Sequence, residues 1–158
     1  MTATIARRTL LLAGAALPLA ARAHHGWSSF DQDRPVYLAG TARQVRWRNP
    51  HAELVLQRPS GLTLPSDLAS RALPAQSARV DGSALLARAA LPRRQDRDWA
   101  IELAPLTRLS AWQVPQIEPG QWLELVGFTF KDEQGDAVLR AEYLFLDGRT
   151  YGMRSSPA

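Results

Sequence analysis

The chain has 158 residues, with 19 basic and 15 acidic side chains, three histidines and no cysteine. The absence of cysteine excludes disulfides, thiolate metal sites such as blue-copper centres and zinc ribbons, and thiol-dependent catalysis. The formal net charge of +4 falls to about +1 without residues 1–23, because 16 basic and 15 acidic side chains remain, interspersed along the chain. No clustered basic face is expected, so the composition argues against nucleic-acid binding.

Residues 1–23 have the organisation of a signal peptide. Arg7-Arg8 form a positive region, Leu10 to Ala20 form a short apolar region, and Ala21-Arg22-Ala23 gives a small-x-small cleavage site. The arginine pair leaves both the twin-arginine and the general secretory route open. The apolar run is shorter than the roughly 20 residues that span a bilayer. We therefore expect a periplasmic protein without an integral membrane segment after processing.

Alternation of apolar and polar residues predicts five strands in the remaining chain. Gly40 lies inside the first strand and suggests a bulge or a bend there. Gly135 is expected to supply the turn between the last two strands. The predicted strands are Val36–Trp47, Ala52–Leu56, Asp98–Leu103, Gln121–Phe130 and Ala137–Leu146.

A short helix is predicted over Pro105–Gln113, between the third and fourth strands, because apolar residues recur there at helical spacing. Five strands with one helix at this position is the order of an OB-like barrel. Residues 59–97 are too long for a hairpin loop and are expected to form an insertion, with short helices over 66–73 and 83–91. The predicted organisation is one mainly β domain over 24–148, followed by a tail over 149–158.

Several motifs resemble those of a family of uncharacterised exported bacterial proteins with an N-terminal His-His pair and a Trp-x-Asn-Pro-His motif. The resemblance covers most of residues 24–57 and, more loosely, 98–148. It implies a small exported β-barrel and no particular activity. The motifs are His24-His25-Gly26, Phe30-Asp31, Gly40-Thr41, Val45 to His51 with its Trp47-Arg48-Asn49-Pro50-His51 core, Pro119-Gly120 and Val126-Gly127.

The histidines provide the candidate metal site. Cleavage after Ala23 would give His24 a free amine, which can chelate one metal ion together with its own imidazole. A second imidazole from His51 would complete the three-nitrogen arrangement called a histidine brace, and such donors suit Cu(II). His25 could substitute by using the amine, its backbone amide nitrogen and its ring. Asp31 could orient a liganding histidine by hydrogen bonding.

Other interpretations of the same residues stay open. The two histidines could form a frayed polar terminus, and His51 could simply hydrogen-bond its turn. Trp27, Trp47 and Phe30 could line a site or belong to the core, and Glu53 and Glu102 could face one side of the barrel.

Three functions are therefore considered. The first is copper carriage or storage. The second is a non-enzymatic module that binds a small ligand or a periplasmic protein partner, with structural histidines. A mono-copper redox enzyme ranks last, because no substrate groove can be argued from the sequence and no catalytic residue is assigned.

Overall fold

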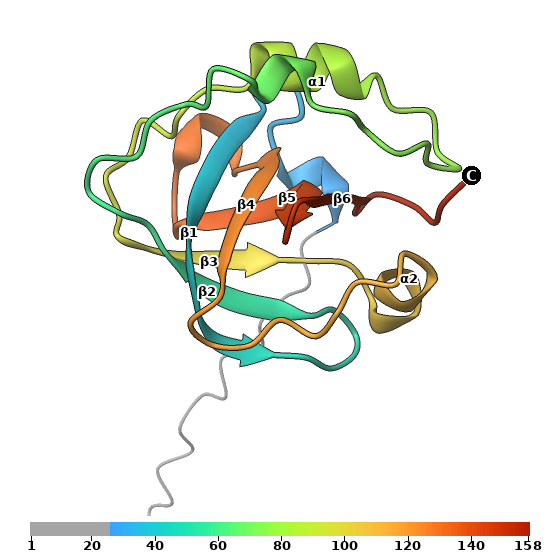
Figure 1. Ribbon diagram of the computed structural model, residues 1–158. Helices are drawn as coiled ribbons and strands as arrows, with labels where there is room; N and C mark the ends of the chain where they lie inside the picture. The colour runs from blue at the N-terminus through green and yellow to red at the C-terminus, as the bar shows by residue number, and fades with distance from the viewer. Residues whose placement is uncertain (1–25) are drawn as a thin grey trace, which may run out of the picture.

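Five strands close into a barrel in the computed structural model, which describes residues 26–158 (Figure 1). Around the barrel the order is β1–β2–β3–β5–β4, and β4 returns to β1. All neighbouring strands are antiparallel except β3 and β5, which are parallel. The expected OB-like, mainly β fold is confirmed. The strands are β1 (Val36–Arg46), β2 (Glu53–Gln57), β3 (Asp98–Glu102), β4 (Trp122–Phe128) and β5 (Val138–Leu146).

The barrel interior is filled by the apolar residues that alternate along each strand. On β2, Leu54 and Leu56 are buried while Glu53, Val55 and Gln57 are partly exposed. Burying one such side chain contributes about 1.5–3 kcal/mol, so this core is the main source of barrel stability. The largest fully buried members of this core include Trp99, Ile101, Leu109, Leu123 and Leu125.

The short helix α2 (Leu106–Ala111) lies between β3 and β4, where a helix was predicted. Leu109 and Trp112 pack into the barrel core. The Trp112 indole N–H donates to the Ser155 carbonyl at 2.7 Å, and Arg108 Nη1 donates to the Met153 carbonyl at 2.8 Å. The helix therefore joins the core to the C-terminal segment.

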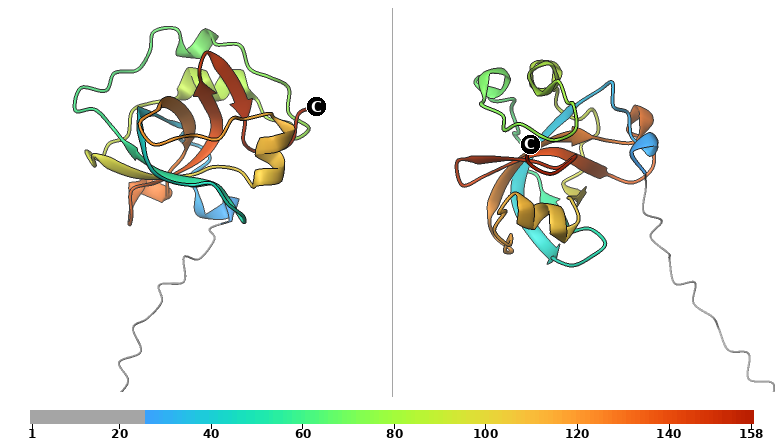
Figure 2. Two further views of the ribbon diagram at one scale, coloured as in Figure 1. Left: turned by 60° about the horizontal axis from the view of Figure 1, so that its bottom comes forward. Right: turned by 90° about the vertical axis from the view of Figure 1, so that its right-hand side faces the viewer.

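Residues 59–97 pack on the outer face of the barrel and contain η2 (Leu68–Ser70) and α1 (Gly82–Arg88). These two helices lie side by side on one side of the barrel (Figure 2). The Asp81 carboxylate caps α1 by accepting from the Ala84 amide at 3.0 Å. A second apolar cluster joins this segment to β1, β4 and β5, with Leu68, Leu86, Tyr37, Phe128 and Tyr143 among its members.

Residues expected as a C-terminal tail contain a sixth strand, β6 (Arg149–Gly152), which forms a hairpin with β5. Asp147 and Gly148 both have positive φ, which matches the twist of a two-residue hairpin turn. An Asp-Gly pair between two apolar runs is the sequence signal that would have revealed this strand.

Gly40 does not form the expected bulge. A Cβ at Gly40 would lie 2.3 Å from the Gln57 carbonyl oxygen, so the glycine allows β1 and β2 to approach closely. The register instead shifts between Arg43 and Arg46, and Gln44 there has φ of 42°. The irregularity was predicted in the correct strand but at the wrong residue.

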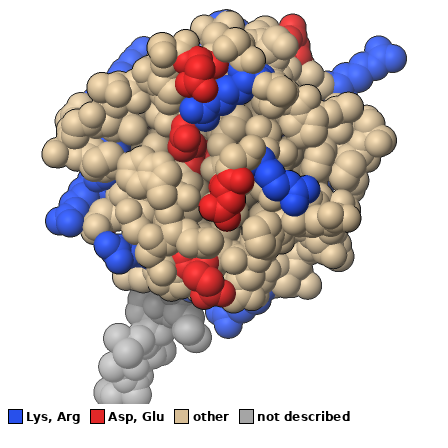
Figure 3. Space-filling model, in the orientation of Figure 1, with Lys and Arg blue, Asp and Glu red and all other residues tan. Residues whose placement is uncertain are grey.

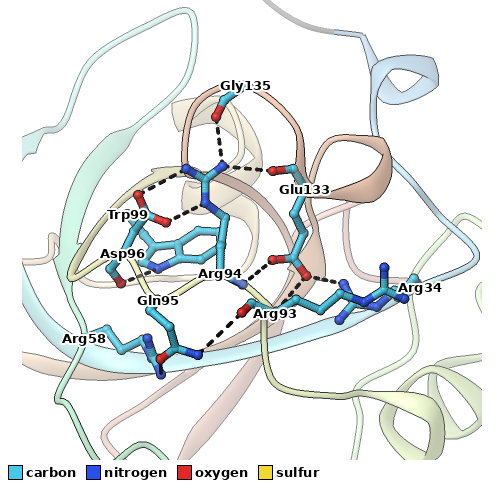
Figure 4. A network of polar contacts seen from close by, with 9 residues as sticks. All are labelled: Arg34, Arg58, Arg93, Arg94, Gln95, Asp96, Trp99, Glu133 and Gly135. Carbon is cyan, nitrogen blue, oxygen red and sulfur yellow. Dashed lines mark hydrogen bonds and ion pairs between the residues drawn. The ribbon is translucent and has the colours of Figure 1, made fainter.

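A polar network ties the end of the 59–97 segment to the β4–β5 connection, which contains η3 (Lys131–Glu133) (Figure 4). The Glu133 carboxylate accepts from the amides of Arg93 and Arg94, each at 3.0 Å, and pairs with Arg34. Arg94 also pairs with Asp96 and donates to the carbonyls of Glu133 and Gly135. Positive φ at Gly135, as expected, and at Glu133 shapes this connection.

No helix in residues 26–158 is both long and apolar enough to cross a membrane.

Candidate functional site

A row of charged and aromatic residues crosses the outer wall of the barrel. The strand registers align Arg46 with Glu53, Glu53 with Glu102, Glu102 with Arg140, and Arg140 with Phe128. We call these five residues the ionic row. Their neighbours Leu54, Ile101 and Leu139 are buried in the barrel core, so the row residues project outward.

Two ion pairs fix the acidic centre of the ionic row. Arg46 Nη1 lies 3.1 Å from Glu53 Oε2, and Arg140 Nη1 lies 3.2 Å from Glu102 Oε2. Burial lowers the pKa of the Arg140 guanidinium, and the charge of Glu102 opposes that effect. The prediction that Glu53 and Glu102 share one side of the barrel is confirmed, because the two residues are direct register partners.

Trp27, in the one-turn helix η1 (Trp27–Ser29), contacts two arginines, Arg140 on β5 and Arg154 after β6. The Arg154 Cζ atom lies 4.0 Å and the Arg140 Cζ atom 4.6 Å from the centroid of the Trp27 ring. The ring also meets Phe128 edge-on, with centroids 6.3 Å apart. Each cation–π contact contributes about 0.5–2 kcal/mol. The start of the described chain is therefore held beside the ionic row.

A buried carboxylate positions Arg154 under Trp27. Glu142 on β5 is fully buried, its Oε2 lies 2.7 Å from Arg154 Nη2, and it accepts a hydrogen bond from Gln76 at 3.3 Å. Burial raises the pKa of Glu142, and Arg154 and Gln76 oppose this effect. The Trp27 anchor thus depends on an ion pair that is largely shielded from solvent.

His51 lies in the β1–β2 connection, directly after the cis Asn49–Pro50 peptide bond. The next residue, Ala52, is fully buried, and its backbone pairs with those of Leu103 and Ala104. Alternation along this extended segment puts His51 on the same outward side as Glu53, two residues further on. His51 is therefore near one end of the ionic row and is half-buried.

The other predicted site residues either stabilise a turn or pack in the apolar core. The Asp31 carboxylate accepts from the Asp33 amide at 3.2 Å, which is a turn interaction. Phe30 is buried and stacks on Phe130 with centroids 5.0 Å apart, and Trp47 packs against the barrel core. A role for Asp31 in orienting a histidine stays a prediction.

His24 and His25 lie outside the described residues. Within residues 26–158, no group of three or more His, Cys, Asp or Glu side chains is arranged to hold a metal ion. His51 and the acids of the ionic row therefore do not form such a group by themselves.

The sequence reasoning missed Arg140, Glu142 and Arg154. The signal was present on the fifth predicted strand, where Arg140 and Glu142 interrupt an otherwise apolar run. Two ionisable residues of opposite sign on a buried strand require partners. Elsewhere, on the face shown in Figure 3, acidic and basic side chains are interspersed, as the composition predicted.

These features define a closed five-stranded β-barrel domain with an ionic row and an anchored N-terminal tryptophan on its outer wall. A model described as a family of unknown function (DUF6152) matches residues 12–63, a range that includes all three histidines. This match supports an uncharacterised domain family. No curated protein and no solved structure matches the chain.

Proposed function

We propose that the exported protein binds Cu(II) for carriage or storage. The ligands are the amine and imidazole of His24, exposed by cleavage after Ala23, together with the imidazole of His51. The observation that carries the proposal is the position of Trp27, which contacts Arg140 and Arg154 beside the ionic row.

The chain between His24 and Trp27 is short. Residues 24–26 span at most about 10–11 Å when fully extended, so an amine on His24 stays within that distance of the Trp27 backbone. Trp27 itself contacts Arg140, which pairs with Glu102, the register partner of Glu53. Because Trp27 is held by these contacts, the chain that precedes it starts from a fixed point, which lowers the entropic cost of binding.

The acidic centre of the ionic row, whose carboxylates are each paired with an arginine, lies on the same outward side as His51. Glu53 and Glu102 carry negative charge on adjacent strands, and a carboxylate that accepts from a liganding imidazole raises its basicity. Imidazole and amine nitrogens must be deprotonated to bind copper, so affinity should fall below about pH 6.

The test uses the protein purified from the periplasm, with its first residue established by intact mass. Cu(II) is titrated and the electron paramagnetic resonance spectrum is recorded for wild type and His51→Ala. We expect one tightly bound Cu(II) with nitrogen hyperfine structure, and loss of one nitrogen donor with at least tenfold weaker binding in His51→Ala, equivalent to about 1.4 kcal/mol. Arg48→Ala changes an exposed residue of the same loop and serves as the matched control.

Three results would contradict parts of the proposal. A first residue other than His24 would remove the required amine. Equal affinity and spectra in wild type and His51→Ala would confine the site to His24 and His25. The absence of copper binding above background would favour the ligand-binding module as the function.

A further inference from the structure

A second feature lies away from the histidines, at the opposite end of β2 from Glu53. A cavity of about 570 Å³ opens between the first two strands, the start of β4, and residues 58–60 and 95–97. Its floor is formed by three residues side by side on neighbouring strands, because Thr41 on β1 is the register partner of both Gln57 on β2 and Trp122 on β4. The volume is within the range of roughly 300–1,000 Å³ that is typical of small-molecule sites.

Arg58 gives the cavity a buried positive charge. Arg58 borders the cavity although the residue is only 8% exposed. Its Nη2 donates to Gln95 Oε1 at 3.3 Å, while its Nε has no hydrogen-bond partner among the described residues. The nearby Asp96 carboxylate is already paired with Arg94. The Arg58 charge also acts on the Asp96 carboxylate, so a bound anion would give Arg58 a partner that it does not share with Arg94.

The wall that holds Arg58 is fixed before a ligand arrives. The Arg58 amide donates to the Arg97 carbonyl at 2.8 Å, which joins the two segments that border the cavity. Gln95 Nε2 donates to the Arg93 carbonyl at 3.4 Å, and Figure 4 shows Gln95 between Arg93 and Arg58. Arg97 also lines the cavity, so a second arginine borders it.

Trp122 supplies a flat apolar surface on the opposite side. It is 52% exposed, one of two large hydrophobic residues of the described chain with such exposure, and it borders the cavity. Thr41, Gln57 and Ser60 add hydroxyl and amide groups that can donate and accept hydrogen bonds. The cavity thus combines two arginines, an exposed indole and several neutral polar groups.

We infer that this cavity binds an acidic sugar, with the carboxylate of a uronic acid residue facing Arg58 and Arg97 and the sugar ring stacked on Trp122. The apolar C–H face of a pyranose matches an indole, and its hydroxyls match the amides and hydroxyls of the floor. The planar guanidinium fork recognises a carboxylate in two-point geometry. Inorganic phosphate would use the arginines but would leave Trp122 without a contact.

The inference is tested by isothermal titration calorimetry on the purified exported protein with methyl β-glucuronide. Methyl β-glucoside has a hydroxymethyl group in place of the carboxylate and is the matched probe. We expect saturable one-to-one binding of the glucuronide and at least tenfold weaker binding of the glucoside. Inorganic phosphate should compete only weakly.

Variants at exposed residues keep the test independent of folding. We expect Trp122→Ala to weaken glucuronide binding at least tenfold, and Arg97→Gln to weaken it about fivefold without changing glucoside binding. Arg88→Gln removes one exposed arginine on α1 that does not line the cavity, and should bind as wild type. His51→Ala should also bind the glucuronide as wild type, which separates this site from the copper proposal.

The inference is overturned if wild type shows no saturable glucuronide heat, or if both cavity variants bind it as tightly as wild type. Equal binding of the glucoside would remove the role of the arginines. Equal competition by phosphate would identify a simple anion site without a sugar ring.

Discussion

Replacement of Glu133 by glutamine should destabilise the protein by about 2–4 kcal/mol, because it leaves buried donors without their acceptor. Glu133 is 7% exposed, and its carboxylate accepts from two backbone amides, those of Arg93 and Arg94, each at 3.0 Å. Glutamine retains only one oxygen, so its NH₂ group would face one of those amides. The ion pair with Arg34 would also be lost. For a domain of this size the melting temperature should fall by roughly 10 °C.

The assay is urea unfolding of the exported protein, followed by tryptophan fluorescence and circular dichroism. Asp132→Asn is the matched control, because Asp132 is the exposed neighbour of Glu133, also has positive φ, and loses the same charge. If Glu133→Gln and Asp132→Asn have the same free energy of unfolding within about 0.5 kcal/mol, the energetic role given to this network is wrong.

The same residue predicts a pH dependence. Burial alone would raise the pKa of Glu133, but hydrogen bonds from the amides of Arg93 and Arg94, with the Arg34 charge, hold it below its ordinary value. A carboxylate whose folded pKa is lowered stabilises the protein above its unfolded pKa of about 4.3. That contribution is lost as the pH falls through the folded pKa. The stability difference between wild type and Glu133→Gln should therefore shrink below about pH 4.

Two further predictions concern the barrel wall. Gly40→Ala should destabilise the protein by more than about 3 kcal/mol, because the added Cβ would clash with the Gln57 backbone. In the control Gly61→Ala the added Cβ meets no atom within 4 Å, so the free energy of unfolding should be almost unchanged. Similar urea midpoints for the two variants would contradict this prediction. Burial raises the pKa values of Tyr37 and Tyr143, and the hydrogen bond to Glu124 raises that of Tyr37 further. In an alkaline absorbance titration both tyrosines should therefore ionise above the ordinary value near 10. Tyr37→Phe should remove one late-titrating group, and uniform titration of all tyrosines in the folded protein would refute the assignment.

The strands and their order could be predicted because the alternation of apolar and polar residues indicates which side of a strand is buried. Val36–Trp47 was expected and Val36–Arg46 is observed, and the helix expected over Pro105–Gln113 contains α2, Leu106–Ala111. Positive φ at Gln44 could not be predicted, because glutamine rarely adopts it and only the surrounding sheet imposes it.

The ionic contacts could not be predicted from spacing alone. Arg34 and Glu133 are 99 residues apart, and Arg154 reaches Glu142 from beyond the hairpin that was expected to be a tail. Such pairs are defined by strand register and by the path of the 59–97 segment, which no local pattern encodes. Arg58 was missed for the same reason, because its burial results from the packing of residues 93–97 over it.

The strand register places the two proposed sites on the same outer surface of the barrel. Glu53, Val55 and Gln57 alternate with buried residues on β2, so they share its outward face. Glu53 belongs to the ionic row and Gln57 to the floor of the cavity. These two residues are about 13 Å apart along the strand. In OB-like barrels the outer surface of the second and third strands is a common place for ligands, which is an argument from fold analogy alone. The two ends of β2 differ in the charges that border them. At one end Glu53 and Glu102 lie side by side, each paired with an arginine of the ionic row. At the other end Arg58 and Arg97 border the cavity that we propose takes an anion, so β2 separates the two proposed sites.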